Sequence, residues 1–109
     1  MAFATTPSPP YFAVIFSSFR TLEGAGYAEA SAAMAKLAAQ QPGYLGIESA
    51  RGADGLGITV SYWRSLEDVR AWKSVAEHVS VQEKGRKLWY SDYRVRVARV
   101  MREYGLAKL

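Results

Sequence analysis

The order in which two kinds of hydrophobic periodicity follow each other constrains the fold of this chain most strongly. Strand-like segments, rich in aromatic and β-branched residues or alternating in polarity, are separated by segments with helical spacing of apolar residues. The extended segments are 11–19, 44–50, 56–63 and 90–104, and the helical segments are 27–40 and 66–89. The turn sequence RGADG joins the second and third extended segments as a hairpin. The predicted order is therefore strand, helix, strand, strand, helix, strand.

This order is typical of the ferredoxin-like α+β fold, a four-stranded antiparallel sheet with two helices on one face. Ser65 is the expected N-cap of the second helix. We expect the sheet face opposite the helices to carry Trp63, several tyrosines and one side of the first strand. A second copy of the chain is the simplest cover for that face, which predicts a homodimer built as a dimeric α+β barrel. The alternation slips near Ala98, which predicts a β-bulge or a strand buried on both sides.

Half of the 109 residues are apolar, so the chain is expected to form one folded domain over 11–109. Residues 1–10 contain three of the four prolines and are expected to form a flexible N-terminal tail. The chain has no cysteine, which excludes a disulfide scaffold, thiolate metal sites and thiol catalysis. It has neither a membrane-spanning apolar run nor a secretory signal pattern, so we expect no membrane partner and a cytoplasmic location.

Positive charge is concentrated near the C-terminus, and this raises the question of nucleic-acid binding. Residues 84–109 hold eight of the fourteen lysines and arginines but two of the ten acidic residues. RNA-recognition modules share the same order of elements, but the third strand, LGITVSYW, lacks their basic and paired-phenylalanine motif. We therefore expect no nucleic-acid partner, and interpret the arginines as a solvated strand face, as partners of acids across a dimer, or as ligands for an acidic substrate group.

Two residues are candidate proton-transfer groups. His78 is the only histidine, and its side chain is the one whose unperturbed pKa lies near neutrality. The alternative for His78 is an ordinary surface position on the second helix. Glu48 lies on the opposite face of its strand from Ile47, where it is either a base facing a cavity or the ion-pair partner of an arginine at position 51, 94 or 96.

Aromatic residues offer the means to enclose a flat ligand, because the chain has three tryptophans and seven tyrosines. The expected substrate-binding residues are Tyr62, Trp63, Trp72, Thr59, Ser61 and Arg94. The hydroxyls would bond a carbonyl or phenol, and the arginine would hold an acidic group. The alternative is that the aromatic residues form core or interface and that the hydroxyls are solvated.

The segments QPGYLGIESARGADGLGITVSYWRSLEDVRAWK and HVSVQEKGRKLWYSDYRVRVARV resemble the antibiotic biosynthesis monooxygenase superfamily of dimeric α+β barrels. The resemblance covers about residues 11–104. It implies a cofactor-independent monooxygenase that acts on a small aromatic, quinol or polyketide-like compound. In this interpretation Glu48 or His78 deprotonates the substrate, and no cofactor or metal is required. A non-catalytic small-ligand-binding dimer is the alternative, because the same fold serves many functions.

The superfamily also contains haem-degrading enzymes, which makes haem a less favoured cofactor. That branch carries an asparagine on the first strand, a tryptophan on the second helix and a histidine ten residues later. Trp72 fits the tryptophan position, but Gln82 occupies the histidine position and the chain has no asparagine. A haem protein here would need His78 as an atypical ligand.

Overall fold

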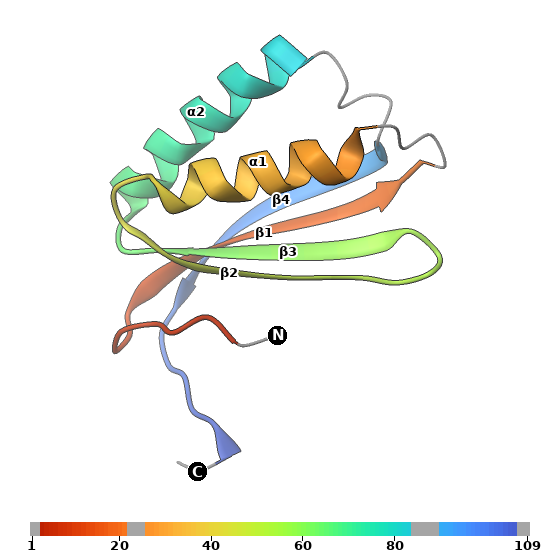
Figure 1. Ribbon diagram of the computed structural model, residues 1–109. Coiled ribbons are helices and arrows are strands. Elements are labelled where there is room, and N and C mark those ends of the chain that lie inside the picture. Colours follow the sequence, from red (N-terminus) through yellow and green to blue (C-terminus); the bar gives the residue numbers. More distant parts are fainter. Residues whose placement is uncertain (1–2, 22–25, 84–89, 107–109) are drawn as a thin grey trace.

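The computed structural model describes residues 3–21, 26–83 and 90–106. The described residues form six elements in the predicted order (Figure 1): β1 (Tyr11–Arg20), α1 (Tyr27–Ala39), β2 (Tyr44–Arg51), β3 (Leu56–Trp63), α2 (Leu66–Glu83) and β4 (Tyr90–Val100). The last strand ends four residues earlier than predicted. The expected continuation of the second helix over 84–89 lies outside the described residues.

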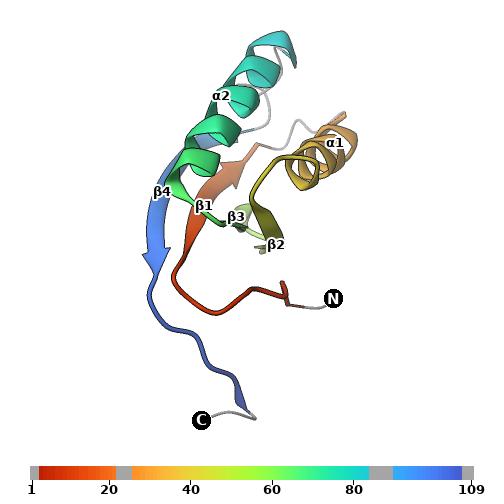
Figure 2. The ribbon, with the colours of Figure 1, turned by 90° about the vertical axis from the view of Figure 1, so that its left-hand side faces the viewer.

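The strands form one antiparallel sheet in the order β2-β3-β1-β4. Both helices lie on the same side of this sheet, and the segments before β1 and after β4 run on the other side (Figures 1 and 2). We call these two sides the helix face and the outer face. The arrangement confirms the predicted ferredoxin-like fold.

Gly26, with φ +83°, is the N-cap of α1, and Gln40 is its C-cap. Gly43, with φ +80°, lies in the turn between α1 and β2 and accepts a hydrogen bond from the Arg64 backbone N–H. The Asp68 N–H donates to Ser65 Oγ at 3.1 Å, which confirms Ser65 as the N-cap of α2. These local signals place α1 and α2 against the sheet at the end where β3 finishes.

Trp63 is the centre of the core, and its placement corrects the sequence prediction. Its side chain is 0% exposed and packs on the helix face with Ala38 and Val69, not on the opposite face as predicted. The ring of Trp72 from α2 stacks on it, with centroids 5.6 Å apart and an interplanar angle of 20°. The inward face of β3 otherwise holds only Gly57, Thr59 and Ser61, so the burial of the large Trp63 ring outweighs the larger number of apolar residues on the other face.

Strand β4 pairs with β1 without a shift from Val100 to Asp92, and its residues 91–99 are exposed, so both predicted alternatives, a bulge near Ala98 and a strand buried on both sides, are wrong. The irregularity lies at the other end of the pair, between Phe19 and Arg20. Side chains of β4 on the helix face are about half exposed, because this edge strand extends beyond the cover of the helices. These are Tyr93, Val95 and Val97, each 50% exposed.

The outer face is partly covered by the chain's own ends. Tyr11 and Ala13 are buried there, and the backbone N–H of Ala4 in the N-terminal segment donates to Glu48 Oε2 at 2.8 Å. Towards the hairpin the same face leaves Leu56 and Ile58 exposed. Among the described residues, neither helix combines the length and the apolar character needed to cross a membrane.

Candidate functional site

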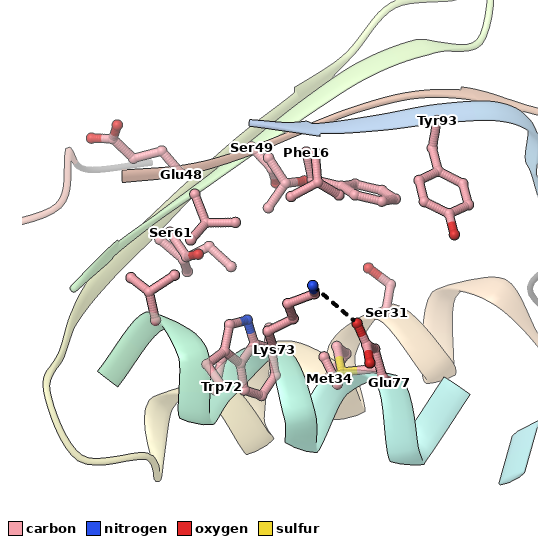
Figure 3. Close-up of a pocket in the computed structure, with 18 of the residues that line it drawn as sticks. Phe16, Ser31, Met34, Glu48, Ser49, Ser61, Trp72, Lys73, Glu77 and Tyr93 are labelled. Carbon is pink, nitrogen blue, oxygen red and sulfur yellow. Dashed lines mark ion pairs between the residues drawn. The ribbon is translucent and has the colours of Figure 1, made fainter. Parts of the chain in front are cut away.

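A cavity of about 490 Å³ lies within the protomer, between the helix face of the sheet and the two helices (Figure 3). All four strands and both helices contribute to its wall. Its volume falls in the range of roughly 300–1,000 Å³ that is usual for small-molecule sites. The space follows from the small side chains of α1, since alanines at positions 30, 35 and 38 face the sheet where larger residues would fill the gap.

One part of the wall is aromatic and apolar. Trp72 lines the cavity and is backed by the buried Trp63, while Val14 and Phe16 of β1 form the floor. Met34 of α1 closes the space from the helix side (Figure 3). Flat rings offered by these walls favour a flat apolar ligand.

Hydroxyl groups follow the floor of the cavity along β2 and β3. Ser49, Thr59 and Ser61 all face the helices, since Thr59 and Ser61 have the same parity as Trp63. Ser61 Oγ accepts a hydrogen bond from Trp63 Nε1 at 2.9 Å. A hydroxyl that accepts in this way keeps its own proton for donation to a second group.

Lys73 and Glu77 lie on the α2 side of the cavity, one helical turn apart, with Lys73 Nζ 3.6 Å from Glu77 Oε1 (Figure 3). The two side chains are 75% and 66% exposed. Solvent screens an ion pair at such an exposed position, so it contributes little to stability. It places a charged rim beside an otherwise apolar space.

At the other end of the cavity, two arginines surround a tyrosine at the start of α1. We call Tyr27, Tyr90, Arg20 and Arg51 the Tyr27 cluster. The Tyr90 hydroxyl donates to the Tyr27 hydroxyl at 3.3 Å, and Arg51 Nη2 donates to it at 3.4 Å. The Arg20 guanidinium carbon lies 3.8 Å from the centroid of the Tyr27 ring, which is a cation–π contact. Tyr27 and Tyr90 both line the cavity.

The electrostatics of the cluster favour negative charge on the Tyr27 oxygen. Burial raises the pKa of Tyr27, but the hydrogen bond from Tyr90 and the charge and hydrogen bond of Arg51 lower it by more, with a further contribution from Ser31. The net effect is a pKa below the ordinary value of 10.0 for a tyrosine. A phenol of this kind is a stronger hydrogen-bond donor than an ordinary one.

The structure brings together three of the predicted site residues. Thr59, Ser61 and Trp72 line the cavity, and Trp63 supports Trp72 from behind. His78 is exposed on α2 and is not one of the lining residues. Because it is the only histidine of the chain, no imidazole of this protomer lines the cavity.

The remaining predicted residues lie on the outer face. The backbone of Glu48 borders the cavity, but its carboxylate points away from the helices (Figure 3). Tyr62 donates its hydroxyl proton to Glu48 Oε1 at 2.7 Å. Arg94 lies opposite Ser17 in the register of β4 and β1, which places it on the same outer face. Within the described part of the chain, no arginine forms an ion pair with Glu48, and Arg51 instead contacts Ser18, Gly55 and Tyr27.

The Glu48–Tyr62 pair lines a second hollow of about 540 Å³ beneath the two chain ends. Burial, and then the hydrogen bond to Glu48 and its charge, raise the pKa of Tyr62 from 10.0 to about 12. The fold therefore holds Tyr62 in its neutral form, and its contribution to stability is complete below pH 10.

We expect the protein to lose stability as the pH rises from about 10 to about 12, because Tyr62 must then ionise beside Glu48. Tyr62→Phe should remove part of this alkaline loss, and should cost about 1 kcal/mol at neutral pH through the lost hydrogen bond. Urea unfolding at pH 8 and pH 11 measures both effects. The exposed Tyr104→Phe is the matched control. An alkaline loss that is unchanged in Tyr62→Phe would contradict the assignment.

Sequence reasoning missed the Tyr27 cluster. The signal available in the sequence was the alternation of side chains along β2, which places Ile47, Ser49 and Arg51 on the same face of the strand. The partner of Arg51 on that face, Tyr27, comes from the start of α1, and no local pattern connects the two positions. Among the described residues, no group of three or more histidine, aspartate or glutamate side chains could hold a metal ion.

Known proteins resemble this chain in sequence and in fold. The model of the antibiotic biosynthesis monooxygenase family matches residues 10–84. An uncharacterised protein of Bacillus subtilis, YqjZ, is 54% identical over 98 residues, which cover 90% of this chain and 86% of the relative.

Two solved structures share the fold at low sequence identity. SnoaB, a cofactor-independent oxygenase from Streptomyces nogalater, has a TM-score of 0.68 and 12% identity, covering 92% of this chain and 100% of SnoaB. A protein of unknown function from Nitrosomonas europaea has a TM-score of 0.66 and 9% identity, covering 90% and 96% of the two chains.

Proposed function

Because the chain belongs to the antibiotic biosynthesis monooxygenase family, we propose that it is a cofactor-independent monooxygenase that oxidises a small phenolic aromatic compound. The observation that carries the proposal is the cavity, which offers about 490 Å³ between aromatic walls and a row of hydroxyls. The fold shared with SnoaB supports the absence of a cofactor.

The chemistry requires a substrate that becomes electron-rich when it ionises. An ionised anthrone or quinol passes an electron to dioxygen, and the two radicals then combine to form a carbon–oxygen bond. For an anthrone the ring methylene becomes a carbonyl, and its two hydrogens leave with the second oxygen atom as water. The protein must exclude bulk water and stabilise the ionised oxygen, and in this cavity hydrogen-bond donors are in place for that task.

Oxygen uptake with 1,8-dihydroxyanthrone tests the proposal. We expect the protein to accelerate uptake above the spontaneous rate, with one dioxygen consumed for each quinone formed and no added metal or flavin. A rate equal to the protein-free rate across anthrones and quinols would overturn the enzymatic assignment.

A non-catalytic ligand-binding function is the second candidate, and one observation favours it. The carboxylate of Glu48 points away from the cavity and His78 is not on its wall, so neither predicted base faces the ligand space. A binder would retain dihydroxyanthraquinone with saturable affinity while showing no oxygen uptake with the corresponding anthrone. In a binder, the substitutions Glu48→Gln and His78→Ala would leave the affinity for dihydroxyanthraquinone unchanged.

We also propose that two copies associate through their outer faces. Phe19, Leu56 and Ile58 are between 41% and 46% exposed on that face, which is more apolar surface than a solvated sheet needs. Arg94 and Arg96 of β4 and the carboxylate of Glu48 lie on the same face, so a two-fold pairing can bring opposite charges together. Light scattering should give the mass of a dimer, and Ile58→Lys should give that of a monomer.

A further inference from the structure

We propose that the Tyr27 end of the cavity is a subsite for an ionised oxygen of the ligand, a phenolate or enolate, with the Tyr27 hydroxyl as its hydrogen-bond donor. The proposal rests on the proposed function in taking this cavity as the ligand site. It adds a recognition group and a chemical requirement, namely that the ligand carries an acidic phenol or enol.

The positive charge of Arg51 is the first support. Nη1 of this half-buried side chain bonds the carbonyl oxygens of Ser18 and Gly55, and Nη2 bonds Ser18 Oγ at 2.8 Å and the Tyr27 hydroxyl. All four acceptors are neutral, and among the described residues no carboxylate pairs with Arg51. A guanidinium in this setting attracts a negative charge placed near it.

The second support is that this guanidinium is held in place. Its four acceptors come from β1, the hairpin and α1, and Gly57 leaves the room that it occupies. A Cβ atom added at Gly57 would overlap the guanidinium of Arg51. Donors and charges that are fixed before the ligand arrives stabilise developing negative charge most effectively.

The third support is that Arg51 acts on the cavity through Tyr27. Its oxygen accepts hydrogen bonds from Arg51 and Tyr90, and both bonds polarise the Tyr27 O–H. The ring lines the cavity beside Ser31, whose hydroxyl lies on the same side of the ligand space. A ligand oxygen that meets these hydroxyls is stabilised when it is ionised, as in other sites where a polarised tyrosine donates to an oxyanion.

Other charged and titratable groups face this region and define the test conditions. Arg20 lies over the Tyr27 ring from β1, and Tyr93 of β4 lines the cavity next to Tyr90. From α2, Glu77 faces the cavity but is paired with Lys73. The affinities for the anion and the neutral dye must therefore be compared below the pH at which the tyrosines ionise, where Tyr27 is a donor.

The experiment uses 1,2-dihydroxyanthraquinone, whose visible spectrum reports whether its phenol is ionised. It is already a quinone, so its binding does not depend on oxygen chemistry. We expect the bound dye to ionise at a lower pH than the free dye, and the protein to bind the anion at least tenfold more tightly than the neutral dye. At high pH, affinity for the anion should fall as Tyr27 itself ionises.

Variants assign the effect to the cluster. Tyr27→Phe should remove most of the preference for the anion, and Gly57→Ala should weaken it by displacing Arg51 while keeping the charge. Tyr104→Phe, an exposed phenol outside the cavity, should leave it unchanged. Because Gly57→Ala keeps every cavity side chain, it preserves the test if Tyr27→Phe fails to fold.

Either of two results would overturn the subsite. One is a bound dye that ionises at the same pH as free dye, or at a higher pH, in the unsubstituted protein. The other is an absence of binding in the pH range where the dye is an anion. The proposed function fails separately, since ionisation of the bound dye without oxygen uptake from an anthrone would retain the subsite and reject the oxygenase.

Discussion

Trp63→Ala is expected to destabilise the fold by about 3–5 kcal/mol, the largest effect of any single substitution considered. The side chain is fully buried, so its removal forfeits apolar burial and leaves a void between Ala38 and Val69. It also removes the ring on which Trp72 stacks and the donor to Ser61 Oγ. Because domains of this size are stable by about 5–15 kcal/mol, the loss should be obvious in urea unfolding.

A substitution on the same side of the molecule controls for general effects of truncation. Leu66→Ala, at the exposed start of α2, should cost less than about 1 kcal/mol. A cost below about 1.5 kcal/mol for Trp63→Ala would contradict the placement of Trp63 on the helix face. It would favour the prediction from the sequence, which places this residue on the sheet face opposite the helices.

Filling the cavity should abolish ligand binding without unfolding the protein. Ala35 faces the cavity from α1, and a tryptophan at that position would occupy much of the ligand space. We expect Ala35→Trp to raise the dissociation constant for 1,2-dihydroxyanthraquinone at least tenfold, a loss of about 1.4 kcal/mol or more. Quenching of tryptophan fluorescence by the dye provides the measurement.

Ala33→Trp is the matched control for this experiment. Ala33 lies on the same helix but is exposed and does not line the cavity. The two variants add the same ring to the same helix, so they differ mainly in whether the ring enters the ligand space. Equal affinities in the two variants would mean that the dye binds elsewhere on the molecule.

The fold could be predicted from the sequence because its signals are local. The alanine-rich spacing of α1, the Asp54-Gly55 turn and the Ser65 cap each act within a few residues, and their order selects one arrangement of strands and helices. The family resemblance pointed to the same fold and is confirmed by the family match.

Which face of each strand points inward was harder to predict, and this determined which of the predicted site residues line the cavity. In β3, Ile58 and Tyr62 alternate with Thr59 and Trp63, so parity alone did not identify the inward face. The burial of Trp63 decides which face of β3 points inward. It directs Thr59 and Ser61 into the cavity and Tyr62 to the outer face. Thr59 and Ser61 therefore line the cavity because Trp63 is buried, and the polarity pattern of the strand does not predict this.

The Tyr27 cluster could not be predicted because its members are distant in sequence. Tyr27 and Arg51 are 24 positions apart, and Tyr27 and Tyr90 are 63 positions apart. Their contact depends on how α1 crosses the sheet and on the space that Gly57 leaves for Arg51. An arginine on a strand otherwise predicts a solvated side chain or an ion pair, and neither expectation indicates a phenol partner.

A crystal structure with bound 1,2-dihydroxyanthraquinone tests the central claim most directly, namely that the space between sheet and helices is the ligand site. We expect the rings to lie in the cavity beside Trp72, with a phenolic oxygen within hydrogen-bond distance of the Tyr27 hydroxyl. Ligand seated in the outer hollow beside Glu48 and Tyr62, with the cavity between sheet and helices free of it, would contradict the account.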